Sequence, residues 1–351
     1  MPTAIAIRKI DGKPGQVYYP LEHIQLPEPQ PKDDEVVVKI TAAALNHRDL
    51  FLRQHLYPGT TFGVPLLADG TGVVVATGSS SEAQKWKGKK VVLNPGSGWK
   101  DDPDGPESPK GYAILGGTKM NPLGTLGETV TIGASELEEA PPHLSSVEAA
   151  ALPLTGLTAW RAVMTKSGQA KPGRNILITG IGGGVALMAL LFASAAGANV
   201  FVSSGSEEKL KKAKALGAAG GVNYKQEGWE KKLMAQMPAE RKSLDAIIDG
   251  AGGDIVALGA KMLRVRCSRC LKAFGNMLMC DVARRRHSQL RHDPRPQDAL
   301  PHERRPQKHR CTRLDNGLAE RVRRHGQVCR EQAPQARGLT DRQRSRQPGR
   351  H

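Results

Sequence analysis

The sequence predicts an α/β protein in which a β-rich N-terminal domain precedes a parallel, doubly wound sheet. Short β-branched runs separated by turn residues fill the first part of the chain. Further along, apolar strand-like runs alternate with segments of helical pattern, the order expected of a parallel sheet with covering helices. A sharp change of composition then follows. We therefore predict three parts, residues 1–143, 144–263 and 264–351.

The first part is predicted to be mostly strands. β-Branched runs between turn residues predict strands at Val36–Ile40, Gly72–Thr77 and Lys90–Asn94, and a strand pair within Gly124–Ile132. Residues 94–122 are rich in Gly, Pro and Asp, which predicts a long surface excursion.

The second part alternates helices and strands. Ser145 or Ser146 is a suitable N-cap, with Glu148 in the first turn of a helix that continues over 147–166. The later elements are predicted in this order: strand 176–179, helix 185–196, strand 200–202, helix 206–216, strand 221–224, helix 229–237, strand 244–249 and helix 254–263.

The chain is organised around the turn between the first two of these strands. Gly180, Gly182, Gly183 and Gly184 follow the strand at once, and the helix opens with Val185. Glycines let a diphosphate approach the main chain, and free N–H groups at the start of a helix favour its charge. The alternatives are a tight turn without a ligand, or a membrane span within the uncharged run 175–206. A buried pair of parallel strands with a covering helix explains that run better.

Charge separates the last part from the rest. Residues 264–351 hold 23 of the 51 Lys and Arg residues, 8 of the 34 Asp and Glu residues, and all five cysteines. The remaining chain is nearly neutral and free of cysteine. Its N-terminus lacks a basic start and a long apolar stretch, so we expect no signal peptide, no membrane association and a cytoplasmic location.

Several motifs together resemble the medium-chain dehydrogenase/reductase superfamily, in particular its zinc-free, quinone-oxidoreductase-like members with an enoyl reductase domain. Besides the glycine turn and Lys209, they are Ala44–Asp49 (ALNHRD), Pro65–Val73 (PLLADGTGV), Leu152–Trp160 (LPLTGLTAW), Leu216–Ala218 and Val222–Tyr224. The resemblance covers residues 1–263. It implies a GroES-like substrate domain over 1–143 and a Rossmann cofactor domain over 144–263, incomplete at its end.

The resemblance also bears on zinc. Zinc-dependent members have Cys where Asn46 stands and His where Ala68 stands. Neither Asn nor Ala is a ligand that catalytic zinc prefers, and Asp69 alone cannot hold the ion. Residues 94–122 also lack the cysteine cluster of a structural zinc lobe. We therefore expect no metal in residues 1–263.

The end of the second strand favours NADP(H) over NAD(H). An NAD site places an acidic residue there, whereas this strand ends in Ser203-Ser204-Gly205-Ser206, with Lys209 one turn into the helix. The resemblance assigns Ser204, Lys209 and Tyr224 to the 2′-phosphate of the coenzyme. The alternative is that Lys209 is a solvated helix residue, and the acidic Glu207-Glu208 weakens the assignment.

The resemblance nominates Asn46, Tyr57 and Thr158 as the residues that line the nicotinamide pocket. Without zinc, such hydrogen-bond donors would stabilise the charge that develops on a carbonyl oxygen as hydride arrives. Tyr57 is equally well explained as an aromatic residue of a loop, and we expect Asp49 to orient a loop. The implied function is NADPH-dependent reduction of a small carbonyl, enone or quinone. The resemblance is also compatible with a homodimer.

Residues 264–351 admit three interpretations. They could be a nucleic-acid-binding arm, but lack interleaved aromatic residues, so nucleic acid is a poor candidate partner. They could hold a zinc knuckle built on Cys267, Cys270, Cys280 and His287. We prefer the third, a shifted reading frame or wrong exon join. Because a parallel sheet cut after four strands leaves an open edge, we expect this product to fold poorly and be weakly active. The alternative function is a non-catalytic nucleotide-binding protein whose basic tail binds a polyanion.

Overall fold

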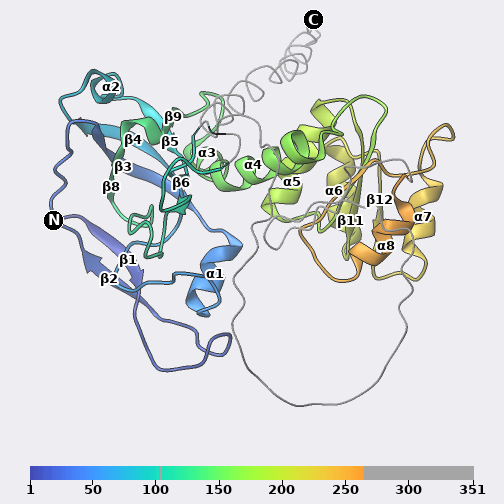
Figure 1. The fold of residues 1–351 in the computed structure, drawn as a ribbon, viewed down its shortest axis with the longest axis horizontal. Coiled ribbons are helices and arrows are strands. Elements are labelled where there is room, and N and C mark those ends of the chain that lie inside the picture. The colour runs from blue at the N-terminus through green and yellow to red at the C-terminus, as the bar shows by residue number, and fades with distance from the viewer. Residues whose placement is uncertain (101, 103–104, 265–351) are drawn as a thin grey trace, which may run out of the picture. The chain divides into compact units, whose positions relative to one another are not determined.

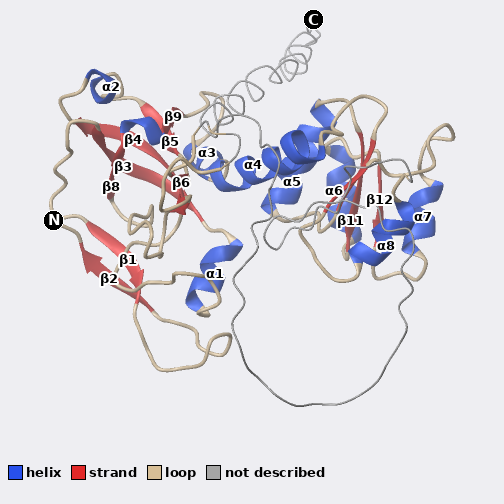
Figure 2. Cartoon of the chain, viewed as in Figure 1, coloured by secondary structure: helices blue, strands red, loops and turns tan. Residues whose placement is uncertain are grey.

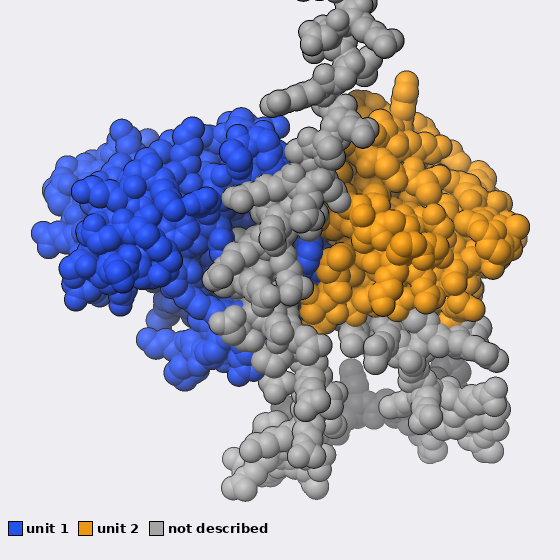
Figure 3. Space-filling model, turned by 90° about the horizontal axis from the view of Figure 1, so that it is seen from above, with its two compact units in different colours: residues 1–161, 316–351 blue, residues 162–315 orange. Residues whose placement is uncertain are grey.

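A computed structural model describes residues 1–264 apart from 101 and 103–104. The described residues divide into two compact units, 1–161 and 162–264, which Figure 3 colours separately. The three interpretations of residues 264–351, including the possible zinc knuckle, fall on residues outside this description except for Arg264.

A five-stranded antiparallel sheet forms the centre of the first unit, with the strand order β8-β3-β4-β5-β9 (Figure 1). Its strands are β3 (Glu35–Ala44), β4 (Asp69–Thr77), β5 (Lys90–Leu93), β8 (Thr129–Gly133) and β9 (Leu137–Glu139). The β-branched side chains of these strands alternate between two faces, and Val36, Val38, Val74 and Val91 are buried together in one core. The strands predicted at 36–40, 72–77 and 90–94 are confirmed as β3, β4 and β5, and β3 and β4 are longer than expected.

Smaller elements complete the first unit. They are β1 (Thr3–Ile7), β2 (Leu21–Gln25), α1 (His47–Arg53), α2 (Ser81–Gln84), β6 (Gly96–Ser97), β7 (Ala113–Ile114) and a 3₁₀ turn at Ala134–Glu136. β1 pairs with β2, and β6 pairs with β7 inside the predicted excursion. The strand pair predicted within 124–132 is wrong. Only β8 forms there, because the carbonyl oxygen of Leu126 accepts the N–H of Ile5 at 2.9 Å and so is not available to a neighbouring strand within 124–132.

The segment 147–166 is helical as predicted, with Gly156 inside it, but it consists of three shorter pieces and not of one continuous helix. They are α3 (Ser146–Ala150), α4 (Pro153–Trp160) and a π-helical segment (Arg161–Ser167). Ser145 is the N-cap of α3, in a capping box with Glu148 as expected. Pro153 interrupts the helix, since it has no N–H to continue the ladder and is well suited to a first helical turn.

The second unit is a four-stranded parallel sheet with the order β12-β11-β10-β13. Figure 2 labels its strands β11 and β12. Its strands are β10 (Asn175–Ile178), β11 (Asn199–Ser204), β12 (Gly220–Asn223) and β13 (Ala246–Ile248). Its helices are α5 (Gly184–Ala195), α6 (Glu207–Ala215), α7 (Trp229–Ala235) and α8 (Ile255–Met262). Every strand and helix predicted here is confirmed to within a few residues. The expected doubly wound sheet is therefore present.

The helices cover both faces of this sheet. Leu233 of α7 and Ile255 of α8 share a core with Leu177, Phe201 and Ile247, which alternate with residues facing the other way. On the opposite face, Leu210 of α6 and Val202 of β11 both adjoin Gly221. The strand order changes direction between β10 and β13, and a ligand site in such a sheet lies at the carboxyl ends of the strands there. Within the described residues, no helix is both long and apolar enough to cross a bilayer.

Candidate functional site

The glycine turn lies at the carboxyl end of β10, as predicted. Gly180 and Gly182 have φ values of +65° and +116°, which side chains with a Cβ rarely adopt. The N–H of Ile181 donates to the carbonyl of Ser203 at 2.9 Å, so the turn is tied to the end of β11. A Cβ on Gly183 would meet only the carbonyl oxygen of Gly180, at 3.7 Å. The backbone here is accessible to a ligand.

The amides that begin α5 follow directly. Gly183 is the N-cap and has no side chain to satisfy the first amides of the helix. The first hydrogen bond within the helix is donated by the N–H of Leu187 to the carbonyl of Gly183, at 3.0 Å. The N–H groups of Gly184 and Val185 come before Leu187 in the chain and have no acceptor within the helix. They point out of its end, where they and the helix dipole favour an anion. The turn and these amides fit the diphosphate of a dinucleotide.

Polar groups bridge β10 and β13 at the change of strand direction. The hydroxyl of Thr179 donates to the Asp249 carboxylate, which also accepts the N–H groups of Ala251 at 3.3 Å and Gly252 at 3.1 Å. Both Thr179 and Asp249 are buried. This network fixes the loop after β13 beside the glycine turn, since a Cβ on Gly180 would lie 3.3 Å from that of Ala251.

Lys209 crosses the glycine turn. A Cβ on Gly182 would stand 2.7 Å from Cδ and 3.1 Å from Nζ of Lys209. Ser206 caps α6 and accepts the N–H of Lys209 at 3.5 Å. The Lys209 amine forms no ion pair within the described residues, whereas the carboxylates beside it are engaged. Asn223 donates to Glu207 at 3.0 Å, and Glu208 pairs with Lys212 at 2.7 Å.

Tyr224 and Lys225 converge on Gly205, the residue after β11. A Cβ on Gly205 would stand 3.1 Å from the Tyr224 hydroxyl and 2.7 Å from Cε of Lys225. Tyr224 is 48% exposed, and its N–H donates to the carbonyl of Ser204 at 3.2 Å. Ser204 itself is buried, and its hydroxyl accepts the N–H of Ser206 at 3.2 Å. The structure thus brings Ser204 and Tyr224 together at one loop and adds Lys225, which the sequence analysis missed.

In the first unit, Asn46 is held by a buried carboxylate. Its Nδ2 donates to Oδ2 of Asp69 at 2.8 Å, and the other oxygen of Asp69 accepts the N–H of Leu154 at 2.8 Å. Asp69 is fully buried at the start of β4. Burial raises the pKa of Asp69 to about 7, against the lowering effect of the hydrogen bonds from Asn46 and Leu154. One N–H of the Asn46 amide is therefore committed, and its second N–H remains for a ligand.

Tyr57 lies near Asn46 through its contact with Arg48, and Thr158 is linked to Asn46 only through the helix that holds Leu154. The guanidinium of Arg48 lies 4.6 Å from the centre of the Tyr57 ring. Thr158 lies on α4 one turn beyond Leu154, whose N–H binds Asp69. No hydrogen bond joins the Thr158 side chain to Asn46 or Tyr57.

The donor set around Asn46 does not fit zinc. An amide, one carboxylate and the apolar Ala68 replace the soft and imidazole ligands that catalytic zinc prefers. Across residues 1–264, with 101 and 103–104 left aside, no three His, Cys, Asp or Glu side chains are grouped as a metal site.

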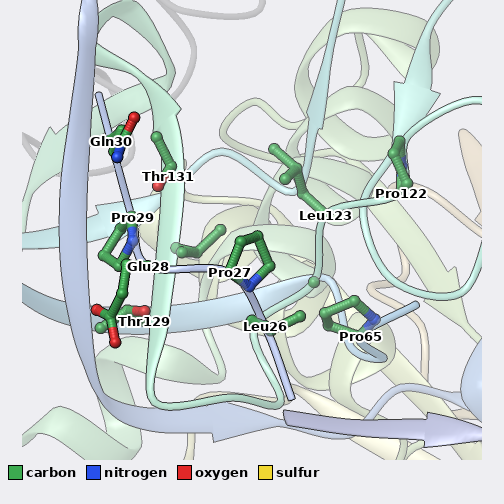
Figure 4. A pocket seen from close by; sticks show the side chains of 12 residues that line it. Leu26, Pro27, Glu28, Pro29, Gln30, Pro65, Pro122, Leu123, Thr129 and Thr131 are labelled. Atoms are coloured by element: carbon green, nitrogen blue, oxygen red, sulfur yellow. The ribbon is translucent and has the colours of Figure 1, made fainter. Parts of the chain in front are cut away.

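A cavity of about 550 Å³ opens elsewhere in the first unit (Figure 4). It is lined by Leu26–Gln30, Pro65, Pro122–Gly124 and Thr129–Thr131. None of the predicted site residues belongs to it. Prolines supply much of its wall, with few convergent polar groups, so its chemistry gives no reason to place the reaction there.

Comparison with known proteins agrees with the two units. Residues 32–142 match the alcohol dehydrogenase GroES-like domain family, and residues 184–278 match the zinc-binding dehydrogenase family. The second match extends past residue 263, where the resemblance was expected to stop. The chain is 50% identical over 269 residues to the zinc-type alcohol dehydrogenase-like protein YogA of Leptosphaeria maculans, covering 75% of each chain.

Two further similarities are more distant. A chloroplast envelope quinone oxidoreductase homolog of Arabidopsis thaliana is 30% identical over 66% of this chain and 64% of its own length. A crystal structure of an NAD-dependent alcohol dehydrogenase superposes with a TM-score of 0.63 at 36% identity, covering 75% of this chain and 74% of the other.

A GroES-like unit followed by a parallel sheet with a dinucleotide-type glycine turn defines an oxidoreductase of the alcohol dehydrogenase and quinone oxidoreductase kind. The chain belongs to the medium-chain dehydrogenase/reductase superfamily. The fold class predicted from the sequence is thereby confirmed.

Proposed function

We propose that the protein is a zinc-free, NADPH-dependent reductase of small carbonyl, enone or quinone compounds. The observation that carries the coenzyme assignment is the pair of lysine side chains at the turn after β10 and at the residue after β11. Lys209 lies over Gly182 and Lys225 lies over Gly205, and neither amine forms an ion pair with a carboxylate of the described residues. An NAD site would place an acidic side chain at this strand end, where Ser204 stands instead.

The second unit would hold the coenzyme through its own backbone and these cations. The glycine turn and the amides of Gly184 and Val185 would bind the diphosphate. Lys209, Lys225 and the Tyr224 hydroxyl would bind the 2′-phosphate by charge-assisted hydrogen bonds. NADPH, when bound, supplies the hydride for the reduction.

The first unit would stabilise the charge that develops on the substrate oxygen. The second N–H of Asn46 and the hydroxyl of Tyr57 are donors with no other partner among the described side chains, and Thr158 is a further candidate. Preorganised donors of this kind lower the barrier because they are already oriented when the charge appears. Asp69 fixes the Asn46 amide through the 2.8 Å hydrogen bond and so keeps its donor edge in one orientation.

The proposal is tested by turnover of the full chain with NADPH or NADH against a panel of a quinone, an unsaturated ketone and an aldehyde. We expect slow turnover with NADPH, slower turnover still with NADH, and no loss of rate after dialysis against a metal chelator. Loss of activity on chelation, restored by Zn²⁺, would contradict the zinc-free assignment. Binding of NADPH without turnover of any class would instead favour a non-catalytic nucleotide-binding protein.

A further inference from the structure

A buried arginine links two of the side chains proposed to act on the substrate. Arg48 lies on α1, between Asn46 and Asp49, and is 7% exposed. Its Nη2 donates to the carbonyl of Gly116 at 2.9 Å, and its Nη1 lies 3.4 Å from Oδ1 of Asp49. Its Nε is buried and finds no hydrogen-bond partner in the described part of the chain. Burying a cation with one donor unsatisfied and a long ion pair is costly, so stability alone is a poor reason for an arginine here.

The stack on Tyr57 gives the guanidinium a second role. The carbon of the guanidinium lies 4.6 Å from the ring centre, within the range of a cation–π contact. The backbone at Tyr57 is fixed separately, because its carbonyl accepts the Thr60 hydroxyl at 2.6 Å. The Tyr57 hydroxyl has no partner among the described residues. The Arg48 guanidinium therefore holds the face of the Tyr57 ring, while the Tyr57 hydroxyl stays available to donate a hydrogen bond.

Asp49 connects this stack to Asn46. One oxygen of Asp49 faces Arg48, and the other accepts the N–H of Asn46 at 2.7 Å. Burial raises the pKa of Asp49 despite the hydrogen bond from Asn46 and the charge of Arg48. The Asn46 side chain in turn donates to Asp69. Contacts thus run from Asp69 through Asn46, Asp49 and Arg48 to Tyr57.

We propose that Arg48 is a positioning residue of the reaction, which orients Tyr57 relative to Asn46 so that both donors serve one substrate oxygen. This inference rests on the proposed function. Arg48 acts through Tyr57, and the two residues form one unit in catalysis. Lysine cannot replace Arg48, because an ammonium group has neither a planar face to stack on the Tyr57 ring nor several donors in a fixed arrangement.

The test is a double-mutant cycle in the full chain, using NADPH and the best substrate of the panel. Arg48→Met and Tyr57→Phe should each lower kcat by roughly 100-fold, the loss expected when one oriented donor is removed. The double variant should be no slower than the slower single variant, since removing Arg48 costs nothing further once the Tyr57 hydroxyl is gone. Arg48→Lys should not restore kcat. The Kd for NADPH, measured by fluorescence, should stay unchanged in all of them.

Arg53 provides a matched control on the same helix. Its guanidinium lies 3.8 Å from the ring centre of Tyr18, and it donates to the Tyr19 carbonyl at 2.9 Å. Arg53→Met removes a cation–π pair of the same kind and should leave kcat within twofold. A multiplicative loss in the double variant, or an equal loss in Arg53→Met, would overturn the inference.

The cycle separates this inference from the proposed function. If Arg48→Met and Tyr57→Phe both retain full kcat while NADPH-dependent turnover persists, the inference fails and the reductase assignment stands. If Arg48→Met fails to fold, Tyr57→Phe combined with Arg48→Lys gives the same test of coupling with the charge retained.

Discussion

The Lys209 side chain lies over Gly182 and the Lys225 side chain over Gly205, each so close that a Cβ on the glycine would force the lysine to move. We expect Lys209→Met and Lys225→Met each to weaken NADPH binding by about 10- to 100-fold, since a charge-assisted hydrogen bond contributes about 1.5–3 kcal/mol. NADH lacks the 2′-phosphate, so its Kd should change little.

The control for these substitutions is Lys211→Met, since Lys211 is an exposed lysine on the same helix as Lys209 and its amine forms no ion pair with any described residue. Fluorescence titration of each variant and of the wild type with both coenzymes measures the dissociation constants. Equal losses for NADPH and NADH would show that the lysines act on the fold or on the diphosphate and not on coenzyme choice.

Asp69 gives the stability of the protein a distinct dependence on pH. Its pKa is raised to about 7, so between pH 4 and 7 the folded state keeps a proton that the unfolded state releases. The stability from this group is therefore present at low pH and lost as pH rises through 7, by up to about 1.4 kcal/mol per pH unit. Asp69→Asn has no titrating carboxyl, so the difference in Tm between wild type and variant should change steadily from pH 5 to about 7 and level off above pH 7. A constant difference would show that Asp69 titrates in its ordinary range.

Among the elements, the turn between β10 and α5 is the one on which cofactor binding depends. Gly182→Ala adds a Cβ 2.7 Å from the Lys209 side chain at a φ of +116°. We expect at least a tenfold loss of NADPH affinity, because the turn must open or Lys209 must move. Gly228→Ala is the control, since Gly228 also has a positive φ, +65°, with open space around it. It should cost about 1 kcal/mol of stability and leave the Kd unchanged. Similar affinities for the two variants would argue against a ligand at the turn.

The elements of the second unit could be predicted because their signals are local. Glycines, β-branched runs and caps such as Ser206 lie within a few residues of the structure that they specify. The break at Pro153 was missed because the apolar pattern on either side of it is continuous. The short strands β1, β2 and β9 were missed because they have weak patterns and depend on pairing with distant strands.

The site residues that the sequence did not reveal depend on distant contacts. Asp69 meets Leu154, 85 positions away, and Arg48 meets Gly116, 68 positions away. Lys225 approaches Gly205 only because β12 pairs with β11 in parallel register. Its position directly after Tyr224, at the end of a predicted strand next to the coenzyme strand, is the signal that could have identified it.

At the scale of the whole molecule, the second unit has a sheet in which β13 pairs only with β10 among the described residues. The relatives in the comparison are matched over about two thirds to three quarters of this chain. If the basic terminal part is a shifted reading frame, translation of the genomic DNA beyond codon 263 in another frame should give apolar strands and a glycine turn. Two frames without either feature would exclude that origin.

The same interpretation predicts low yield and low stability for the full chain, because an open edge and uncovered helix faces forfeit roughly 1.5–3 kcal/mol for each large apolar side chain left unburied. Thermal unfolding of the purified protein measures this directly. A sharp transition above about 65 °C, beyond the range of ordinary mesophilic domains, would contradict it.

The most direct test of the central claim, a dinucleotide bound at the glycine turn with its 2′-phosphate between Lys209 and Lys225, is a fluorescence titration of the folded full chain. The monomeric or oligomeric fraction is first isolated by size exclusion, its secondary structure is checked by circular dichroism, and NADPH and NADH are then added separately. We predict saturable binding of both, with NADPH at least tenfold tighter. Absence of binding by either coenzyme to folded protein, or tighter binding of NADH, would contradict the account.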